Sequence, residues 1–249
     1  MAGYDAPMVA EPPGVDELPE PRSTRRELAV SRSLDAARAR AEKRVQRFLD
    51  AGFELLDEGA TGNEFTVQVV VARSGQSLRS FYQYFAGKYE LLLALFEESV
   101  RATASHLRTV VGDDGPAAGR LQRFVVEYYR LCRPDAPSTA ARRSPTPTMG
   151  EFAQQLLTSH PREAAKVFVP LVAALTDLLE QAAAEGAVRP ELANVRVAGA
   201  VLQAIMFNAF ATTISGAPPA PPDAAAEELF ELVFAGMATD GVSGGSGRR

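Results

Sequence analysis

The chain has 249 residues, of which 46% are hydrophobic and 23% are charged, so it is long enough for one large domain or two modest ones. A single cysteine, Cys132, excludes an intrachain disulfide, and two histidines, His106 and His160, leave no Cys/His cluster that could bind zinc. We therefore expect a protein of a reduced, cytoplasmic compartment with no metal and no cofactor. The net charge of −5 argues against indiscriminate binding of nucleic acid.

Charge is distributed unevenly along the first fifth of the chain. Residues 1–21 contain five acidic and no basic side chains, whereas residues 22–47 contain nine basic and three acidic ones, a net of +6. A basic segment of this kind in an otherwise acidic protein is typical of a confined polyanion-binding surface, which could enter a minor groove beside bound DNA. The alternative is an ordinary solvated lead-in to a helix.

The N-terminus is acidic and rich in proline, so we do not interpret it as a signal peptide. The most apolar segment, residues 197–216, would be long enough to cross a bilayer as a helix. It contains Gln203 and Asn208, and no Lys/Arg cluster flanks it. We expect no membrane insertion.

The pattern of elements begins with a predicted disordered extension over residues 1–34, rich in proline and charge. A first helix is predicted over 35–58, followed by Gly59 as a stop. Residues 66–74 contain four valines, which would suit a strand as well as a helix. We favour a helix because no second strand-like segment exists to pair with it.

Gly75 permits a tight turn after this helix, and Ser77 is placed to cap a short helix over 78–85. The rest of the chain reads as helices with short breaks, which predicts an all-α fold of about nine helices. The later helices are predicted at 88–111, 117–133, 149–158, 161–186, 191–215 and 222–238, before a flexible tail at 241–249.

Two helices joined by a glycine-containing turn, the second one short and capped by serine, form the layout of a helix-turn-helix. Phe81 and Phe85 are four residues apart and are expected to share the buried face of the second helix. The side chains on its other faces are candidates for contact with DNA. These are Leu78, Arg79, Tyr82 and Gln83.

Residues 66–92 carry the pattern T-V-x5-R-S-G-x-S-x3-F-Y-x-Y-F-x2-K-x-E-L-L, which resembles the DNA-binding module of the tetracycline-repressor (TetR) family of transcriptional regulators. Residues 44–96 carry the strong part of the resemblance, because Ala51, Phe53 and Gly59 are similar to the family's first helix. The matching positions of the module are Thr66, Val67, Gly75, Ser77, Tyr82, Tyr84, Phe85, Lys88, Glu90, Leu91 and Leu92.

The resemblance implies a homodimer that binds a palindromic double-stranded DNA operator and is released by a small molecule. It places a helix-turn-helix DNA-binding domain at 35–87 and a helical regulatory and dimerisation domain at 88–240. It also assigns phosphate contacts to Thr66, Tyr82 and Lys88. Base or nearby backbone contacts fall to Gln68, Leu78, Arg79 and Gln83, and with the capping Ser77 these make eight candidate DNA-binding residues.

The sequence departs from the family pattern in three ways, which involve four residues. Gln76 stands where a small apolar residue is usual in the turn, and Val71 replaces the alanine that lets the two helices cross closely. Leu78 and Arg79 replace a pair that is commonly small and polar, which suggests an unusual operator.

In the C-terminal half, aromatic residues at helical spacing are candidates for the core or for an apolar ligand pocket. The pocket candidates are Phe124, Tyr128, Phe152, Phe168 and Phe207, and they predict a small hydrophobic effector. The last two helices are apolar on nearly all sides and need a further surface to bury against. The dimer-interface candidates on them are Leu202, Met206, Ala209, Leu229, Leu232 and Val233.

No constellation of residues suggests an enzyme, because His106 and His160 lie far apart and Cys132 has no adjacent partner in the sequence. The prediction is a DNA-binding transcriptional regulator, with repression as its mode of action. The alternative is a helical ligand-binding or adaptor dimer whose DNA-binding module has decayed.

Overall fold

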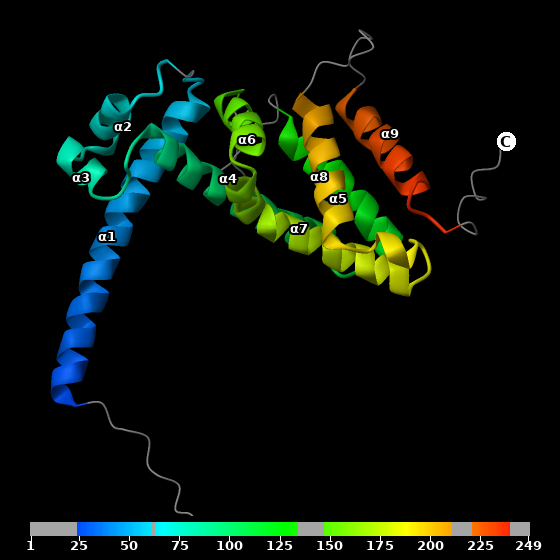
Figure 1. Cartoon of the computed structure of the whole chain (residues 1–249), viewed down its shortest axis with the longest axis horizontal. Helices are drawn as coiled ribbons and strands as arrows, with labels where there is room; N and C mark the ends of the chain where they lie inside the picture. The colour runs from blue at the N-terminus through cyan, green and yellow to red at the C-terminus, as the bar shows by residue number, and fades with distance from the viewer. Residues whose placement is uncertain (1–23, 61–62, 134–146, 211–220, 240–249) are drawn as a thin grey trace, which may run out of the picture. The chain divides into compact units, whose positions relative to one another are not determined.

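The structure is a computed structural model that describes residues 24–60, 63–133, 147–210 and 221–239. Within these residues the chain is helical, with one isolated β-bridge between Val188 and Ala238 (Figure 1). The chain divides into two compact units, residues 1–44 and residues 45–249, and helix α1 (Arg25–Asp57) contributes to both.

Helix α1 begins ten residues before the predicted start, so the prediction of disorder up to residue 34 is wrong for residues 25–34. Thr24 and Glu27 form a reciprocal cap: the Glu27 N–H donates to Thr24 Oγ1 at 3.3 Å and the Thr24 N–H donates to Glu27 Oε2 at 2.7 Å. This capping box satisfies two backbone donors that otherwise have no partner at a helix start. Residues 1–23 of the predicted extension lie outside the described residues.

The predicted helix-turn-helix is present in the second unit as α2 (Val67–Ser74) and α3 (Leu78–Tyr82). The ambiguous valine-rich segment is therefore helical. Gly75 joins the two helices with φ of +64°, a left-handed conformation that glycine adopts without a steric penalty. Helix α3 ends at Tyr82 rather than at residue 85, because Tyr84 and Phe85 both bond back to the Phe81 carbonyl in a tighter turn.

The remaining helices agree with the predicted ranges to within a few residues. They are α4 (Lys88–Val111), α5 (Ala117–Cys132), α6 (Pro147–Ser159), α7 (Pro161–Ala184), α8 (Val195–Phe210) and α9 (Pro222–Ala235), with a short 3-10 helix at Pro190–Leu192. Helix α4 packs on α5, α6 and α7, and α5 packs in addition on α8 and α9. The predicted continuation of α8 to residue 215 lies outside the described residues.

Helix α7 is the one helix of the described residues that is long and apolar enough to cross a membrane. Its buried side chains recur every three or four residues, among them Ala164, Val167, Leu171 and Leu175. These side chains form one face that packs on α4, α5, α6 and α8, which is the arrangement of a core helix in a soluble helical protein.

The core of the helix-turn-helix is aromatic. The Phe48 ring of α1 meets the Phe81 ring at 5.4 Å and the Phe85 ring at 6.1 Å, both edge to face. Phe48 and Phe81 are fully buried. Close to this core α1 also crosses α4, and a Cβ atom added at Gly52 would lie 2.8 Å from Leu95 Cδ1. Only glycine permits this close approach without a shift of Leu95.

Replacing Phe48 by alanine is expected to destabilise the protein by about 3–5 kcal/mol, because it removes a buried ring from between two others and leaves a cavity. The free energy of unfolding would be measured by urea titration. The exposed Gln68 serves as the matched position in the same module, and Gln68→Ala should change stability by less than about 0.5 kcal/mol. Equal stabilities for the two variants would contradict the aromatic core.

Candidate nucleic-acid interface and ligand cavity

Helix α3 separates a buried face from an exposed one. Phe81 and Phe85 are buried as predicted, whereas Tyr82 is 55% exposed and Leu78 is 43% exposed. Arg79 and Gln83 are also exposed, and Arg79 pairs with no carboxylate among the described residues. The four predicted recognition side chains are therefore available on one short element.

Serine and threonine caps fix the starts of α2 and α3. Thr66 Oγ1 accepts a hydrogen bond from the Val69 N–H at 3.3 Å, and Ser77 Oγ accepts one from the Ser80 N–H at 3.1 Å. Both hydroxyl groups keep a hydrogen atom that can still be donated outward. Gln68, one turn into α2, is exposed.

Lys88 begins α4, and its Nζ lies 5.8 Å from the centre of the buried Phe65 ring. An ammonium group over an aromatic face is attracted by the negative face of the ring's quadrupole. Glu90 stabilises the same helix start by accepting a 2.6 Å hydrogen bond from the Ala86 N–H.

An ion-pair clamp that the sequence interpretation missed ties α2 to the end of α1. The Arg73 guanidinium donates to both carboxylate oxygens of Glu58 at 2.8 Å and lies 3.5 Å from Glu54. This bidentate contact lowers the pKa of Glu58 and raises that of Arg73. The available signal was the spacing of Glu54 and Glu58, four residues apart on one helix face.

The departures from the family pattern are accommodated in the turn. The Ser80 hydroxyl donates to Gln76 Oε1 at 3.4 Å, and the Gln76 side chain is half-buried. Val71 is half-buried against the core, and the adjacent Val70 is fully buried between the helices. The two helices therefore keep their contact despite the larger side chains.

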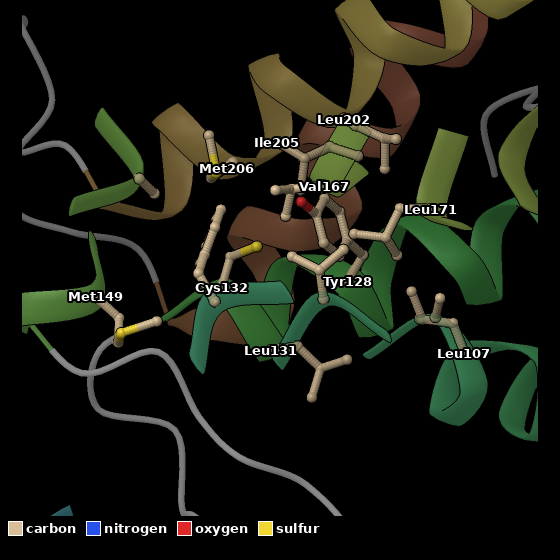
Figure 2. Close-up of a cluster of buried hydrophobic side chains, with 14 of the residues drawn as sticks. Leu107, Tyr128, Leu131, Cys132, Met149, Val167, Leu171, Leu202, Ile205 and Met206 are labelled. Atoms are coloured by element: carbon tan, nitrogen blue, oxygen red, sulfur yellow. The ribbon is translucent and has the colours of Figure 1, made fainter. Parts of the chain in front are cut away.

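An apolar cavity of about 50 Å³ lies between α4, α5, α6, α7 and α8. Figure 2 shows part of its surroundings, with sulfur atoms contributed by Cys132 of α5, Met149 of α6 and Met206 of α8. The polar groups in its lining are the hydroxyls of Ser99, Thr103 and Tyr128 and the Cys132 thiol, so the lining carries no charge.

A larger apolar groove of about 740 Å³ runs between α7 and α8. Phe168 and Met206 line both this groove and the inner cavity, so these two side chains border both spaces. Val169 and Val195 line the groove and are 57% and 64% exposed, and Arg196 is its one charged lining residue. The groove is within the size range of small-molecule sites, whereas the inner cavity is too small without movement of its lining.

Two of the five predicted pocket residues, Tyr128 and Phe168, line these spaces. The prediction is corrected for Phe124 and Phe152, which are buried in the core and line neither space, and for Phe207, which is 36% exposed and also lines neither. The sulfur-containing residues of the cavity were missed, because a lone cysteine or methionine in a helix carries no sequence signal of a pocket.

Cys132 is a neutral thiol. Burial raises the pKa of Cys132 to about 12, although a hydrogen bond with Tyr128 acts in the opposite direction. Burial also raises the pKa of Tyr128 well above its usual value. In the described residues no three His, Cys, Asp or Glu side chains gather in a group that could hold a metal ion.

The first turn of α4 is tied to α6 and α7. The Tyr89 hydroxyl donates to Glu163 Oε2 of α7 at 2.6 Å, and the Tyr89 ring contacts Phe152 of α6 at 5.5 Å and His160 at 5.2 Å. Burial and the Glu163 carboxylate raise the pKa of Tyr89 to about 12. Tyr89 directly follows Lys88, so a shift of α6 or α7 would reach the side of α4 that carries Lys88.

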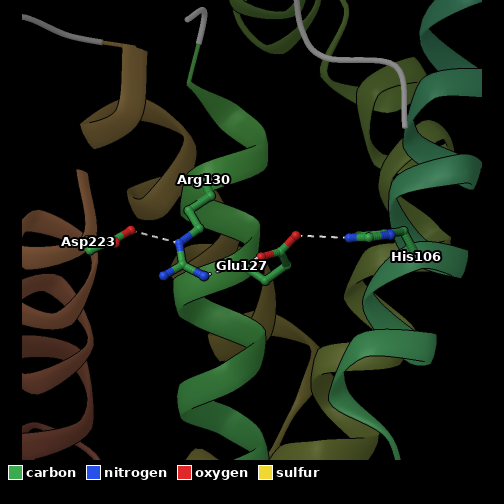
Figure 3. Close-up of polar contacts among 4 residues, drawn as sticks. All are labelled: His106, Glu127, Arg130 and Asp223. Carbon is green, nitrogen blue, oxygen red and sulfur yellow. Dashed lines mark hydrogen bonds and ion pairs between the residues drawn. The ribbon is translucent and has the colours of Figure 1, made fainter. Parts of the chain in front are cut away.

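The far half of α4 is tied to α5 and α9 by a chain of polar contacts (Figure 3). His106 Nε2 and Glu127 Oε1 share a 2.9 Å hydrogen bond, and Arg130 lies 3.6 Å from the other oxygen of Glu127. The Arg130 Nε–H then donates to Asp223 of α9 at 2.9 Å. Helix α4 is thus anchored to the C-terminal domain near both of its ends.

The predicted dimer residues are corrected in part. Leu202, Met206 and Leu229 are buried in their own domain, because α8 and α9 pack these side chains inward on α5 and α7. Ala209 and Val233 are half-buried. Leu232 is 73% exposed on α9.

Similar folds are known among bacterial regulators. A fatty acid degradation regulator, FadR, from Bacillus halodurans matches 77% of this chain and 98% of its own length with a TM-score of 0.55 and 16% identity. FadR from Bacillus subtilis, solved in complex with stearoyl-CoA, matches 77% of this chain and 98% of its own length with a TM-score of 0.55 and 15% identity. A TetR-family regulatory protein from Rhodococcus RHA1 matches 80% of this chain and 99% of its own length with a TM-score of 0.51 and 19% identity.

The chain therefore has the all-α fold of TetR-family regulators. No family model matches it, and no curated protein matches it in sequence.

The neutral thiol leads to a measurable result. At pH 8 we expect iodoacetamide to label Cys132 about a thousandfold more slowly in the native protein than in urea, because the thiol pKa rises from 9.0 to about 12. The contribution of this pKa shift to the free energy of unfolding is fully present below about pH 9. It is lost as the pH rises toward 12, because only the thiol of the unfolded chain ionises in that interval. Similar labelling rates in both states would contradict a buried, neutral thiol.

Proposed function

We propose that the protein is a cytoplasmic transcriptional regulator that binds a palindromic DNA operator as a homodimer and is released by a small hydrophobic molecule. One observation carries the DNA-binding part: α3 buries Phe81 while it exposes Leu78, Arg79, Tyr82 and Gln83. A short helix that presents four side chains of this kind after a capped turn is the recognition element of a helix-turn-helix.

The assigned roles follow from the chemistry of each side chain. Arg79 to a guanine and Gln83 to an adenine are the natural bidentate pairs, each contributing about 1–3 kcal/mol of discrimination. Leu78 can contact a thymine methyl group or a sugar. Tyr82 and Lys88 would donate to phosphates.

The starts of α2 and α3 supply further hydrogen-bond donors for phosphates. The Thr66 and Ser77 hydroxyls each keep a hydrogen atom to donate. The first backbone N–H groups of α2 lie at the positive end of the helix dipole. Gln68 is exposed on α2, and we propose that it contacts a base or the adjacent backbone.

A homodimer would bury the apolar surface that α8 and α9 leave exposed. Leu232 of α9 and Phe207 of α8 are large, exposed apolar side chains on these helices, and Ala209 and Val233 are half-buried. In this proposal Leu202, Met206 and Leu229 support the interface from within each protomer rather than contact the partner.

The effector site is proposed to be the groove between α7 and α8 together with the inner cavity, opened by rotation of Phe168 or Met206. The inner lining has no charged side chain, so the buried part of the effector would be uncharged and apolar. Arg196 is the one charged residue of the groove. The stearoyl-CoA bound by the Bacillus subtilis neighbour shows that a similar fold can bind a ligand with a long apolar chain. The phosphate groups of such a ligand would need more cationic side chains than the single Arg196 of this groove.

Helix α4 would transmit the signal. An effector that separates α7 from α8 would move Glu163, and through Tyr89 the first turn of α4 with Lys88. Coupling of about 1–3 kcal/mol between the two sites is enough for such regulation. We propose no catalytic role and no cofactor.

The DNA-binding proposal is tested by selecting fragments of the source genome with the purified protein. We expect a palindromic site, and we expect the double variant Tyr82→Phe/Lys88→Ala to weaken binding at least tenfold and reduce its salt dependence, because phosphate contacts release counterions. Arg79→Ala should instead relax the preference at one base pair per half-site.

The matched control is Gln181→Ala, which changes an exposed polar residue of α7 outside the helix-turn-helix and outside the proposed effector site, and this variant should bind DNA as wild type does. Binding that is weak, equal for all sequences and indifferent to Tyr82 and Lys88 would sink the proposal. It would favour the ligand-binding or adaptor dimer with a decayed DNA-binding module.

The effector mechanism is tested by screening uncharged apolar molecules, with stearoyl-CoA for comparison, for release of the selected operator. For a molecule that releases the operator, the Tyr89→Phe variant should bind the molecule with normal affinity. The effect of the bound molecule on operator affinity should be about five- to tenfold smaller than in wild type, because the variant lacks the hydrogen bond to Glu163. Calorimetry reports binding, and fluorescence anisotropy of labelled operator reports release.

Glu163→Gln retains an acceptor for the Tyr89 hydroxyl and should preserve most of the coupling. If the molecule released the Tyr89→Phe variant from the operator as easily as it releases wild type, the proposed route through the first turn of α4 would be wrong. Release by stearoyl-CoA and by none of the uncharged molecules would overturn the proposed effector class.

A further inference from the structure

The described helical part of the first unit, residues 25–44, has a one-sided charge distribution. We call residues 25–44 of α1 the basic arm. At 100° per residue, five of its basic side chains fall within an arc of about 120°. These are Arg25, Arg32, Arg40, Lys43 and Arg44, and all five are exposed.

The opposite side of the basic arm carries its acids. Glu27, Asp35 and Glu42 fall within a narrow arc together with Arg38, which pairs with Glu42 at 2.8 Å. Asp35 accepts a hydrogen bond from Ser31 on the same side of the arm. By sequence, the arm contains seven basic and three acidic residues, a net of +4, in a chain of net charge −5. The basic face is therefore a defined surface rather than an average over the segment.

We infer that the basic face of the arm binds the phosphate backbone of duplex DNA next to the operator, an inference that rests on the proposed function. Phosphates are the complementary partner because the face is a row of cations about 28 Å long, the length of about eight base pairs. The arm is covalently continuous with the first helix of the DNA-binding module, so DNA bound there is at high effective concentration for it.

The helical conformation changes the mode of contact that the sequence suggested. An α-helix with side chains is about 10–12 Å wide, whereas the minor groove of B-DNA is about 6 Å wide, so residues 25–44 do not thread into it as an extended arm would. Contact along the phosphate rows leaves the helix intact. Such contacts carry no base specificity, and they add affinity and salt dependence.

An anionic membrane is the competing partner for a basic helix. Interfacial helices need a broad apolar face with large side chains beside the basic one. Among the described side chains of the arm, the large apolar ones are Val30 and Leu34, and the other apolar ones are alanines. This face is too weak to enter a bilayer, which favours DNA.

The test uses the full-length protein and a genomic fragment selected as above. The fragment is prepared in two forms, one trimmed to the palindromic site and one extended by ten base pairs at each end of that site. Wild type should bind the extended form at least tenfold more tightly at 0.1 M salt. The variant Arg32→Gln/Arg40→Gln/Lys43→Gln should lose this advantage, and its slope of log K against log salt should fall by about three on the extended form only. Glutamine preserves helix propensity, and circular dichroism checks the helix content.

The matched single variants are Arg32→Gln on the basic face and Arg38→Gln on the opposite face, which remove the same charge. The first should reduce the slope by about one, and the second should leave it unchanged. Equal effects of the two, or no gain from the extended ends, would overturn the role of the arm while leaving operator recognition intact. Failure to select any fragment would overturn both proposals.

Vesicles of phosphatidylglycerol and phosphatidylcholine provide the remaining comparison. We expect no co-sedimentation of wild type with them. Co-sedimentation that the triple variant loses, with unchanged DNA affinity, would overturn the assignment and identify the membrane surface as the partner of the arm.

Discussion

The edge-to-face packing of Phe48 against Phe81 and Phe85 is the contact on which the position of the helix-turn-helix depends. Helix α3 has five residues, far fewer than a helix needs to be stable in water by its own hydrogen bonds. Its position therefore comes from burial of Phe81, and of Phe85 three residues beyond its end, on α1, from the Ser77 cap and from the left-handed turn at Gly75. With the buried face fixed, the helical period decides which four side chains point outward.

Helix α4 connects this module to the rest of its unit. Its start is held by Lys88 over Phe65, by Glu90 as a backbone cap and by the Tyr89–Glu163 hydrogen bond. Its far half is held through His106 and Glu127 on α5. A helix that is restrained near both ends moves as one body, so in the proposed mechanism a displacement of its partners reaches the helix-turn-helix without unfolding it. We propose that such a displacement begins at the neutral, apolar lining between α4 and α8.

Much of the helix-turn-helix could be predicted because its signals are local. Thr66, Gly75 and Ser77 act through neighbouring backbone groups, so their residue types alone indicate where α2 and α3 begin and how they are joined. The start of α1 was also encoded locally, in the Thr24–Glu27 capping box, but the surrounding proline and charge suggested disorder instead. The early end of α3 was not encoded in this way, since it reflects the packing of Phe85 on α1.

The sequence by itself determined the all-α class, the caps and turn of the recognition module, and the inward direction of Phe81 and Phe85, because these follow from helical periodicity and local hydrogen bonds. Only the tertiary structure decided which apolar residues line a cavity, which support the core and which remain exposed. Phe124 and Tyr128 lie on the same buried side of α5, yet only Tyr128 borders the cavity. Periodicity specifies that a helix face is buried, but the partner it is buried against depends on how several helices pack together.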